Sequence, residues 1–266
     1  MTLEGAVQMT MAAMLRTAPV LLVLAALLFA ERRWPWRAAL PRHWAGNLLL
    51  GGLSFLSVLV LPLASMTAAA QWAAAHDFGL LNQLAMPQWL RITLAVVALD
   101  LALYAQHRAL HTGPLWALHR VHHLDPMLDV TSGVRFHPLE AGASALYKSL
   151  VVLLLGAPVA AAGLSALLTL LGSLFTHANI RLPSRVERWL RKLVVTPALH
   201  RIHHSTVSAE TQSNFGSVLW VWDHLFGSAK PRSSAGEALQ LGVANLLEQT
   251  TIAKMLLEPF HRRPVQ

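Results

Sequence analysis

The chain alternates long apolar runs with short segments rich in arginine, proline and histidine. Its first apolar run, residues 17–30, reaches the length of a membrane span if the helix begins near Met9 and Arg16 extends its charge to the bilayer surface. A cleaved signal peptide would also place an apolar run here. Because the run ends in Glu31-Arg32-Arg33 rather than in a small-x-small cleavage site, we favour a membrane helix.

Three further apolar runs complete the predicted membrane region, at residues 44–70, 89–106 and 141–176. The last run is long enough for two segments that meet at Gly156-Ala157-Pro158, so we expect a helical hairpin that need not cross the bilayer fully. Hydrophobic residues make up 55% of the chain and charged residues only 13%, about half of the charged fraction of soluble domains. The predicted fold class is therefore an all-α integral membrane protein with about four transmembrane helices, the hairpin included.

The distribution of basic residues predicts the orientation in the membrane. Residues 31–43 carry four arginines, whereas residues 71–88 hold a single formal charge, Asp77. The positive-inside rule places the first segment in the cytoplasm and the second outside. The third run then returns the chain to the cytoplasm, and a hairpin that enters and leaves on one side keeps the following residues there. We expect a multi-pass protein of a bacterial inner membrane.

The net charge of +8 does not indicate nucleic-acid binding. The basic residues cluster at membrane boundaries, where the positive-inside rule and anionic lipids account for them. One such cluster comprises Arg181, Arg185, Arg188, Arg191 and Lys192. No nucleic-acid partner is therefore expected.

Histidine is the unusual residue of this chain, with 14 copies and no cysteine. HRALH (107–111), HRVHH (119–123) and HRIHH (200–204) space their histidines on one helix face, so each box is expected to present its imidazoles to a single point. The boxes hold His107, His111, His119, His122, His123, His200, His203 and His204. Because this set exceeds what one zinc ion can use, it predicts a two-metal centre. His137 and His177 stand alone between the boxes.

The types of residue around the histidines favour oxygen chemistry. Neutral imidazole suits iron, zinc, copper or nickel. A hydrolytic zinc site of the H-E-x-x-H type would need a glutamate as base, but the first box reads HRALH. A carboxylate diiron site would need E-x-x-H pairs on its bundle helices, and none lies on a predicted span. A histidine-rich dimetal centre that activates dioxygen remains the best fit.

The placement of the boxes predicts a site at the membrane surface. Asp100, Tyr104, His107 and His111 recur on one helical stripe that continues from the third apolar run. Prolines at positions 114, 126 and 138 interrupt the following region, as a compact cap requires. Residues 186–199 are amphipathic and are expected to lie at the interface before the last box.

These segments resemble the fatty acid hydroxylase superfamily, the membrane family that includes sterol desaturases, sterol methyl oxidases and alkylglycerol monooxygenase. The matching segments are DLALYAQHRALH (100–111), LWALHRVHH (115–123), RFHP (135–138), FTHANI (175–180), LHRIHH (199–204) and NFGSVLWVWDHLFG (214–227). They cover most of residues 100–227, whereas residues 1–90 match only as hydrophobic spans. The resemblance implies a cytosolic, histidine-rich helical cap over the membrane helices.

The resemblance also implies a non-haem diiron enzyme that hydroxylates or desaturates a lipid C–H bond, using O₂ and externally supplied electrons. The eight box histidines would ligate the metals by position, together with His177 and, from the HP element, His137. The implied cofactor is two iron ions, with zinc as a substitute in a purified sample. Because no segment resembles a fused cytochrome b5 domain, the electron donor would be a separate protein, ferredoxin- or cytochrome b5-like with its reductase. No residue beyond the ligands needs to be catalytic.

Asp100, Asn179 and Asp223 are candidates for supporting the ligands. An ionisable group in or near a span is costly and usually functional. We therefore expect Asp100 to orient a ligand imidazole through its second nitrogen, or else to form a structural hydrogen bond between helices. The same two alternative roles are expected for Asn179 and Asp223.

Two other functions stay open at this point, a dizinc membrane hydrolase on the same scaffold and a non-catalytic metal- or haem-binding membrane protein. The substrate (sterol-like, fatty acyl or isoprenoid) and the choice between hydroxylation and desaturation are not determined. We expect one membrane domain over residues 1–266. It would comprise N-terminal spans at 1–90, the catalytic region at 91–227 and an amphipathic tail at 228–266.

Overall fold

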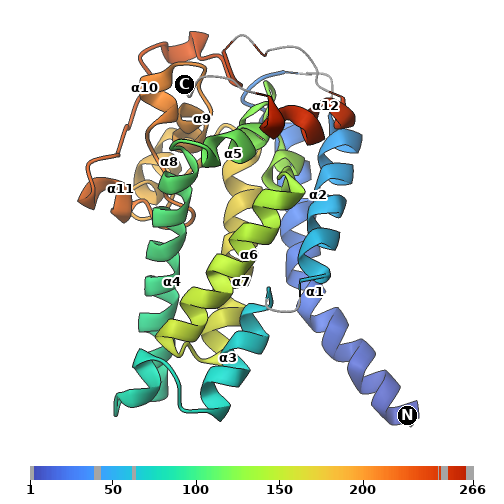
Figure 1. Ribbon diagram of the computed structural model, residues 1–266. Coiled ribbons are helices and arrows are strands. Elements are labelled where there is room, and N and C mark those ends of the chain that lie inside the picture. Colours follow the sequence, from blue (N-terminus) through green and yellow to red (C-terminus); the bar gives the residue numbers. More distant parts are fainter. Residues whose placement is uncertain (1–2, 39–42, 62–63, 245, 247–250, 262–266) are drawn as a thin grey trace.

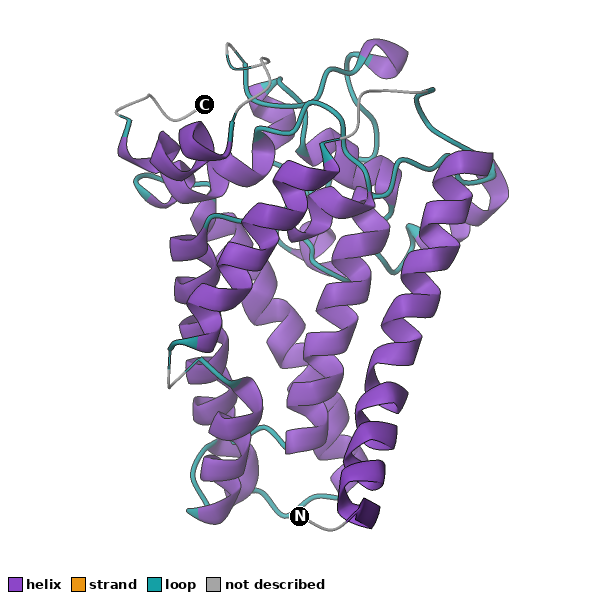
Figure 2. Ribbon diagram, turned by 90° about the vertical axis from the view of Figure 1, so that its right-hand side faces the viewer, coloured by secondary structure: helices purple, strands orange, loops and turns teal. Residues whose placement is uncertain are grey.

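The molecule is a bundle of long helices capped at one end by short helices and loops (Figure 1). The computed structural model describes residues 3–38, 43–61, 64–244, 246 and 251–261. Within these residues every regular element is a helix, as Figure 2 shows. The predicted all-α class is thus confirmed for the described part of the chain.

The apolar runs form the long helices of the bundle. Helices α4 (Gln88–Leu110), α6 (Pro138–Leu155) and α7 (Val159–His177) are long and apolar enough to cross a membrane. Helix α1 (Leu3–Arg33) contains the first apolar run and continues through Pro19. Helix α2 (Trp44–Leu59) is apolar but has only 16 residues.

The predicted second span at residues 44–70 is wrong in its extent. Helix α2 ends at Leu59, and a separate helix, α3 (Met66–Ala75), follows. The sequence places Pro62 between them, and a proline removes a helical hydrogen bond and clashes with the preceding turn. Ser65 then starts the new helix, since its side chain accepts a hydrogen bond from the backbone N–H of Ala68 at 3.2 Å.

The predicted hairpin is present, and it turns at the expected break. Helix α6 ends at Gly156, whose φ of 62° lies in the left-handed region, and α7 begins directly after Pro158. A Cβ at position 156 would lie 2.7 Å from the carbonyl oxygen of Phe78, so the turn also needs glycine for close packing. Both outer ends of the hairpin therefore lie at the capped end of the bundle (Figure 1).

The bundle is packed internally but remains apolar outside. Leu27 of α1 belongs to a buried cluster with Leu174 of α7, and Leu99 of α4 to another with Val152 of α6. Many large apolar side chains nevertheless stay exposed along the long helices, among them Leu22, Phe55, Leu59, Leu150 and Leu154. A soluble monomer rarely exposes so large an apolar surface, whereas lipid would cover it.

The cap consists of short helices between and after the long ones. It includes α5 (Leu115–His123), α8 (Ser184–Leu190), α9 (Pro197–His203), α10 (Ser208–Thr211), α11 (Val221–Leu225) and α12 (Ile252–Leu257), with the 3₁₀ segments η2 (Val130–Val134), η3 (Gly236–Ala238) and η4 (Glu258–Phe260). A further 3₁₀ segment, η1 (Leu80–Gln83), lies in the connection between α3 and α4. Met255 of α12 packs on Trp116 and Val121 of α5, so the C-terminal segment covers the second histidine box.

Candidate metal centre

Nine histidines converge at the capped end of the bundle in two groups. The five-histidine group contains His107, His111, His119, His123 and His203, and the four-histidine group contains His122, His177, His200 and His204. Within each group the candidate ligand atoms lie within 4.8 Å of one another. The two groups draw on α4, α5, α7 and α9, so helices far apart in sequence meet at one place.

Each H-x-x-H-H box divides between the two groups, which corrects the expectation that a box points to a single place. In the second box His119 and His123 enter the five-histidine group, whereas His122 enters the other. In the third box His200 and His204 enter the four-histidine group, and His203 crosses to the first. Residues i and i+4 share a helix face more closely than i and i+3, and here the difference separates the two groups. The repeated box is therefore a device for holding two neighbouring centres.

Hydrogen bonds from Nδ1 fix the orientation of several rings. The Nδ1 atoms of His107, His122, His177 and His203 lie 2.7–3.0 Å from backbone carbonyl oxygens of Phe215, Arg135, Ser173 and Ser213, respectively. A carbonyl can only accept, so each Nδ1 carries the proton. The Nε2 atom of each ring is therefore an unprotonated lone pair, the form that ligates metals.

These lone pairs face one another at short range. Nε2 of His122 lies 3.0 Å from Nε2 of His177 in the four-histidine group, although both rings donate elsewhere through Nδ1. Such a pair has no proton to share, so a cation between the two nitrogens is needed to make the contact favourable. Two nitrogens about 2.1 Å from one ion lie about 3 Å apart when they subtend a right angle. The spacing fits a shared metal ion.

The five-histidine group contains the same arrangement. Nε2 of His107 lies 3.1 Å from Nε2 of His119, and Nδ1 of His119 lies 2.7 Å from Oε1 of Glu140. The other nitrogens are also available, because neither ring nitrogen of His111 or His123 has a hydrogen-bond partner among the described residues. A buried polar nitrogen without a partner is costly unless something binds it.

Burial keeps the cap imidazoles neutral. It lowers the pKa of His111, His122, His123, His200 and His204 well below the ordinary histidine value, with further lowering from neighbouring histidines. Burial lowers the pKa of His203 to about 3. Neutral imidazole is the ligating form, so the donor set suits a transition metal.

Glu140 is a functional candidate that the sequence reasoning missed. It is 2% exposed, sits in the first turn of α6, and accepts the Nδ1 proton of His119. A carboxylate behind a ligand histidine fixes the ring and raises its basicity. The signal was present in the sequence, since Glu140 is a charge at the start of an apolar helix, three residues after His137.

Neither carboxylate oxygen of Asp100 forms a hydrogen bond with an imidazole among the described residues, contrary to the first expectation. Its Oδ2 accepts hydrogen bonds from the backbone N–H of Leu219 at 3.1 Å and from the indole of Trp222 at 2.8 Å. It therefore ties α4 to the segment after the third box. This segment carries Phe215, whose carbonyl holds His107. Asp100 therefore acts on His107 only indirectly, through the segment that positions the Phe215 carbonyl.

Asp223 and Asn179 also act through the backbone. Asp223 accepts hydrogen bonds from the backbone N–H groups of Phe215 and Gly216, at 2.7 and 2.9 Å, and so fixes the carbonyl that holds His107. Asn179 exchanges hydrogen bonds with the backbone of Arg37, joining the end of α7 to the segment after α1. Among the described residues, neither side chain forms a hydrogen bond with a histidine of the two groups.

The structure does not bring His137 into either group. Its Nδ1 caps α6 by accepting a hydrogen bond from the backbone N–H of Leu139 at 3.1 Å, and its Nε2 lies 3.2 Å from the carbonyl oxygen of Leu256. With both nitrogens engaged, His137 links α6 to α12. His177, the other isolated histidine, does lie in the four-histidine group.

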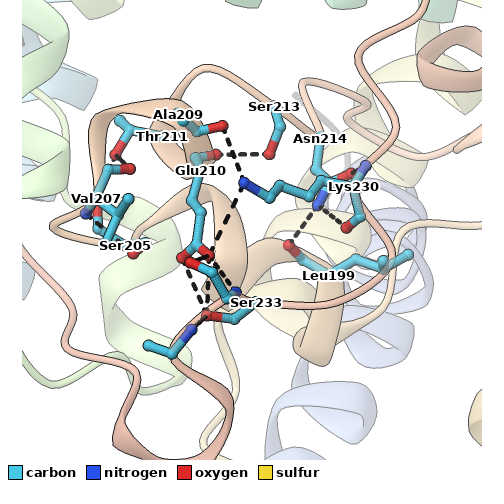
Figure 3. Close-up of polar contacts among 12 residues, drawn as sticks. Leu199, Ser205, Val207, Ala209, Glu210, Thr211, Ser213, Asn214, Lys230 and Ser233 are labelled. Carbon is cyan, nitrogen blue, oxygen red and sulfur yellow. Dashed lines mark hydrogen bonds and ion pairs between the residues drawn. The ribbon is translucent and has the colours of Figure 1, made fainter.

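A buried carboxylate holds the turn that follows the third box. Figure 3 shows Glu210 facing Ser233, and its carboxylate also accepts hydrogen bonds from the backbone and side chain of Ser234 at 2.6 and 2.8 Å. Burial raises the pKa of Glu210, but hydrogen bonds from Ser205, Ser234 and Ser233 outweigh it, and the net pKa lies below its ordinary value. The same turn carries Ser213, whose carbonyl accepts from His203.

A cavity of about 600 Å³ extends from the histidines into the bundle and is partly open at its side. His107 and His119 of one group and His122, His177 and His200 of the other line its metal-facing end. Apolar side chains such as Phe55, Leu99 and Leu170 line the remainder. A volume of this size is typical of a small-molecule site. The cavity can therefore bring one apolar substrate to both groups.

Comparison with known proteins agrees with this geometry. The family model described as fatty acid hydroxylase matches residues 92–228, which include all nine clustered histidines. The chain belongs to the fatty acid hydroxylase family. No solved structure matches it.

The relatives of this family member are lipid-modifying enzymes by name. It is 28% identical to an ornithine lipid hydroxylase, OlsE, of Rhizobium tropici over 94% of this chain and 75% of that protein. It is 28% identical to the alkylglycerol monooxygenase of Danio rerio over 53% of this chain, and 27% identical to that of Homo sapiens over 50%. The match spans only 30% and 29% of those two longer proteins.

Proposed function

We propose that this protein is a membrane-bound, histidine-ligated diiron monooxygenase that hydroxylates a C–H bond of a lipid. The observation that carries the proposal is the pair of histidine groups at the head of an apolar cavity. The nine clustered histidines would hold two iron ions, with His137 outside the ligand set. When bound, the two ions would supply the activation of O₂, with electrons from a separate ferredoxin- or cytochrome b5-like donor.

The residues of the chain would contribute ligand geometry and substrate position. Phe215, Arg135, Ser173 and Ser213 carbonyls and the Glu140 carboxylate would hold five imidazoles in one tautomer. The cavity walls would exclude water and align a lipid chain beneath both groups. No separate general base is needed in this scheme.

The membrane orientation proposed here puts the histidine end in the cytoplasm. Arg32 and Arg33 end α1 at the same end of the bundle as the histidine boxes (Figure 1), and Arg185 and Arg188 lie on α8 just after α7. The positive-inside rule favours the cytoplasmic side for such clusters. A bacterial inner membrane suits this orientation and a soluble electron donor.

The names of the relatives support hydroxylation over desaturation. They are called a hydroxylase and monooxygenases, and the ornithine lipid hydroxylase matches nearly the whole of this chain. Ornithine-type lipids are therefore the first substrates to test, and alkylglycerols the second. The same names weigh against a dizinc hydrolase. A haem carrier would need facing histidines within the spans, whereas these cluster at one end of the bundle.

Isotope labelling tests the proposal and separates it from hydrolysis. Cells that express the protein would be grown under ¹⁸O₂, and their lipids compared by mass spectrometry with those of cells lacking it. We expect a product heavier by one ¹⁸O atom. A product that forms without O₂, or that takes its oxygen from water, would refute the monooxygenase.

Histidine variants from both groups complete the test. His122→Ala and His203→Ala should each abolish the product while the protein still accumulates in the membrane, because each removes a ligand of a different group. His76→Ala is the matched control, since His76 is exposed and stacks on Trp72 away from both groups. Near-normal product from either ligand variant would contradict the assignment.

A further inference from the structure

One face of α6 carries polar residues down the length of the cavity. Glu140, Ser144 and Lys148 are spaced four residues apart, so they lie on one face of the helix, and all three line the cavity. Glu140 lies beside the histidines, and Lys148 is eight residues further on, about 12 Å along the helix axis. The lysine is thus inside a candidate membrane span, below the metal-facing end.

Lys148 has no hydrogen bond or ion pair with any described residue. Lys148 takes no part in the ion pairs of the described residues. Glu140, on the same face of α6, attracts it only at longer range and contacts His119 through Oε1. Glu140 and Lys148 are the two formally charged side chains, histidines aside, among the described residues that line the cavity. An ammonium group at membrane depth is costly without a counter-charge, so its presence argues for a function.

Hydroxyl groups surround the same level of the cavity. Ser165 of α7 lies nine residues after the hairpin turn at Gly156, and Lys148 lies eight residues before it, so the two are at similar depth on the two helices. Both Ser165 and Ser144 line the cavity, and their hydroxyls donate to no described residue. Thr169, one turn closer to the histidines, instead donates to the carbonyl of Ser165 at 2.8 Å. An ammonium with two free hydroxyls is a donor set for an anion.

We propose that Lys148, with Ser144 and Ser165, binds an anionic group of the lipid substrate, a carboxylate or a phosphate, inside the cavity; this rests on the proposed lipid hydroxylase function. The helix spacing then sets where the lipid is oxidised. Its reacting carbon must lie within about 12 Å of the anionic group. Oxidation close to the polar end of the lipid follows, rather than far along an alkyl chain.

A snorkelling lysine is the alternative role for this residue. Lysines near the ends of spans extend to the interface and cover apolar surface. Lys148 is seven residues before the end of α6 and lines the cavity rather than the lipid face. A snorkelling role would make the site indifferent to charge on the ligand, so ligand charge separates the two roles.

Photolabelling of the full-length, metal-loaded protein in phosphatidylcholine nanodiscs tests the proposal. The probes are dodecanoate with a diazirine in its chain and the methyl ester of the same molecule. At low probe concentration we expect the acid to label peptides of α6 and α7 at least tenfold more than the ester. Lys148→Met should abolish this preference, and Lys148→Arg should keep most of it. Leu150→Met is the matched control, since Leu150 lies on the same helix and is 52% exposed on the outer face.

Competitors identify the anion, and the outcomes are separable. Excess dodecyl phosphate should compete with the acid probe and excess dodecanol should not. Equal labelling by acid and ester in the wild type, or a preference that survives Lys148→Met, would overturn the proposal. If Lys148→Met loses its metals, the comparison of acid with ester labelling in the wild type and in Lys148→Arg still tests the proposal. Labelling needs neither O₂ nor turnover, so selective labelling without an ¹⁸O product would refute the hydroxylase alone.

Discussion

His119 joins the metal centre to the cavity helix, with its Nδ1 2.7 Å from Oε1 of Glu140 and its Nε2 3.1 Å from Nε2 of His107. The carboxylate is buried, and its second oxygen has no hydrogen-bond partner among the described residues. Glu140 therefore holds the His119 ring through one oxygen, which fixes the orientation of the ring as a ligand.

Glu140→Ala should weaken metal binding by about 10- to 100-fold, the usual effect of losing a hydrogen-bonded partner behind a ligand. Glu140→Gln should lose less, because the amide oxygen can still accept the Nδ1 proton. Iron retained during titration with a chelator measures both variants. Equal retention by wild type and Glu140→Ala would show that the contact does not support the metal.

The two groups differ in their number of histidine donors, so we expect them to differ in how well they tolerate the loss of one histidine. His111→Ala leaves four imidazoles in its group, whereas His200→Ala leaves three in the other. We expect His200→Ala to lower the iron content from about two ions towards one, and His111→Ala to retain more of its metal. Metal analysis by mass spectrometry after gel filtration checks the order. The reverse order would indicate that His111 is a principal ligand and that another imidazole of its group is dispensable.

The spacing of residues in the sequence revealed much of this site but not how its parts divide. Helical periodicity brought Asp100, Tyr104, His107 and His111 onto one stripe, and the structure directs these side chains to the cap. Periodicity could not assign His122 and His119 to different groups. The two groups lie side by side, and the difference between a spacing of three and a spacing of four residues decides which group a histidine enters. Glu140 was not predicted because its partner His119 is on another helix. Local sequence spacing does not indicate which residues of two different helices contact each other.

The membrane region shows the same limit. Hydropathy predicted the α6–α7 hairpin because glycine and proline mark its turn locally. It merged α2 and α3 into one run, since the residues around Pro62 are as apolar as the helices they join. His137 matched a family motif, yet its Nδ1 caps α6 through the nearby Leu139 N–H, and its Nε2 contacts the carbonyl oxygen of Leu256, more than a hundred residues away.

Gly133 should resist substitution because it lies against the backbone of α7. A Cβ at this position would lie 2.8 Å from the carbonyl oxygen of Ser173, the atom that accepts the Nδ1 proton of His177. Gly133→Ala should therefore displace α7 and lower iron content and product several-fold, with a stability cost of about 1–3 kcal/mol. Gly163→Ala is the matched control, since that site on α7 has open space and alanine favours a helix. Wild-type iron content in Gly133→Ala would refute the close approach.

Asp100 should contribute to stability more than to metal binding. Asp100→Ala removes the acceptor for the Leu219 N–H and the Trp222 indole, which leaves two donors unpaired at a cost of about 1–3 kcal/mol each. The unfolding temperature in detergent should fall by several degrees, while the amount of iron bound per folded protein should change little. Trp222→Phe should show a smaller fall, because it removes one donor together with one bond. A loss of iron without a loss of stability would instead assign Asp100 to the metal centre.

Glu210 should make stability depend on pH in the acidic range. Its folded-state pKa lies below the ordinary value because the hydrogen bonds from serines outweigh burial, so the unfolded chain binds its proton more tightly. The stabilisation is therefore complete above about pH 5 and is lost as the pH falls through the folded-state pKa. Glu210→Gln should be less stable than the wild type at pH 7, by about 1–3 kcal/mol, and the difference should shrink below about pH 4. Melting temperatures of the two proteins over this range measure the effect. A difference independent of pH would show that the serine hydrogen bonds do not depend on the charge of the carboxylate.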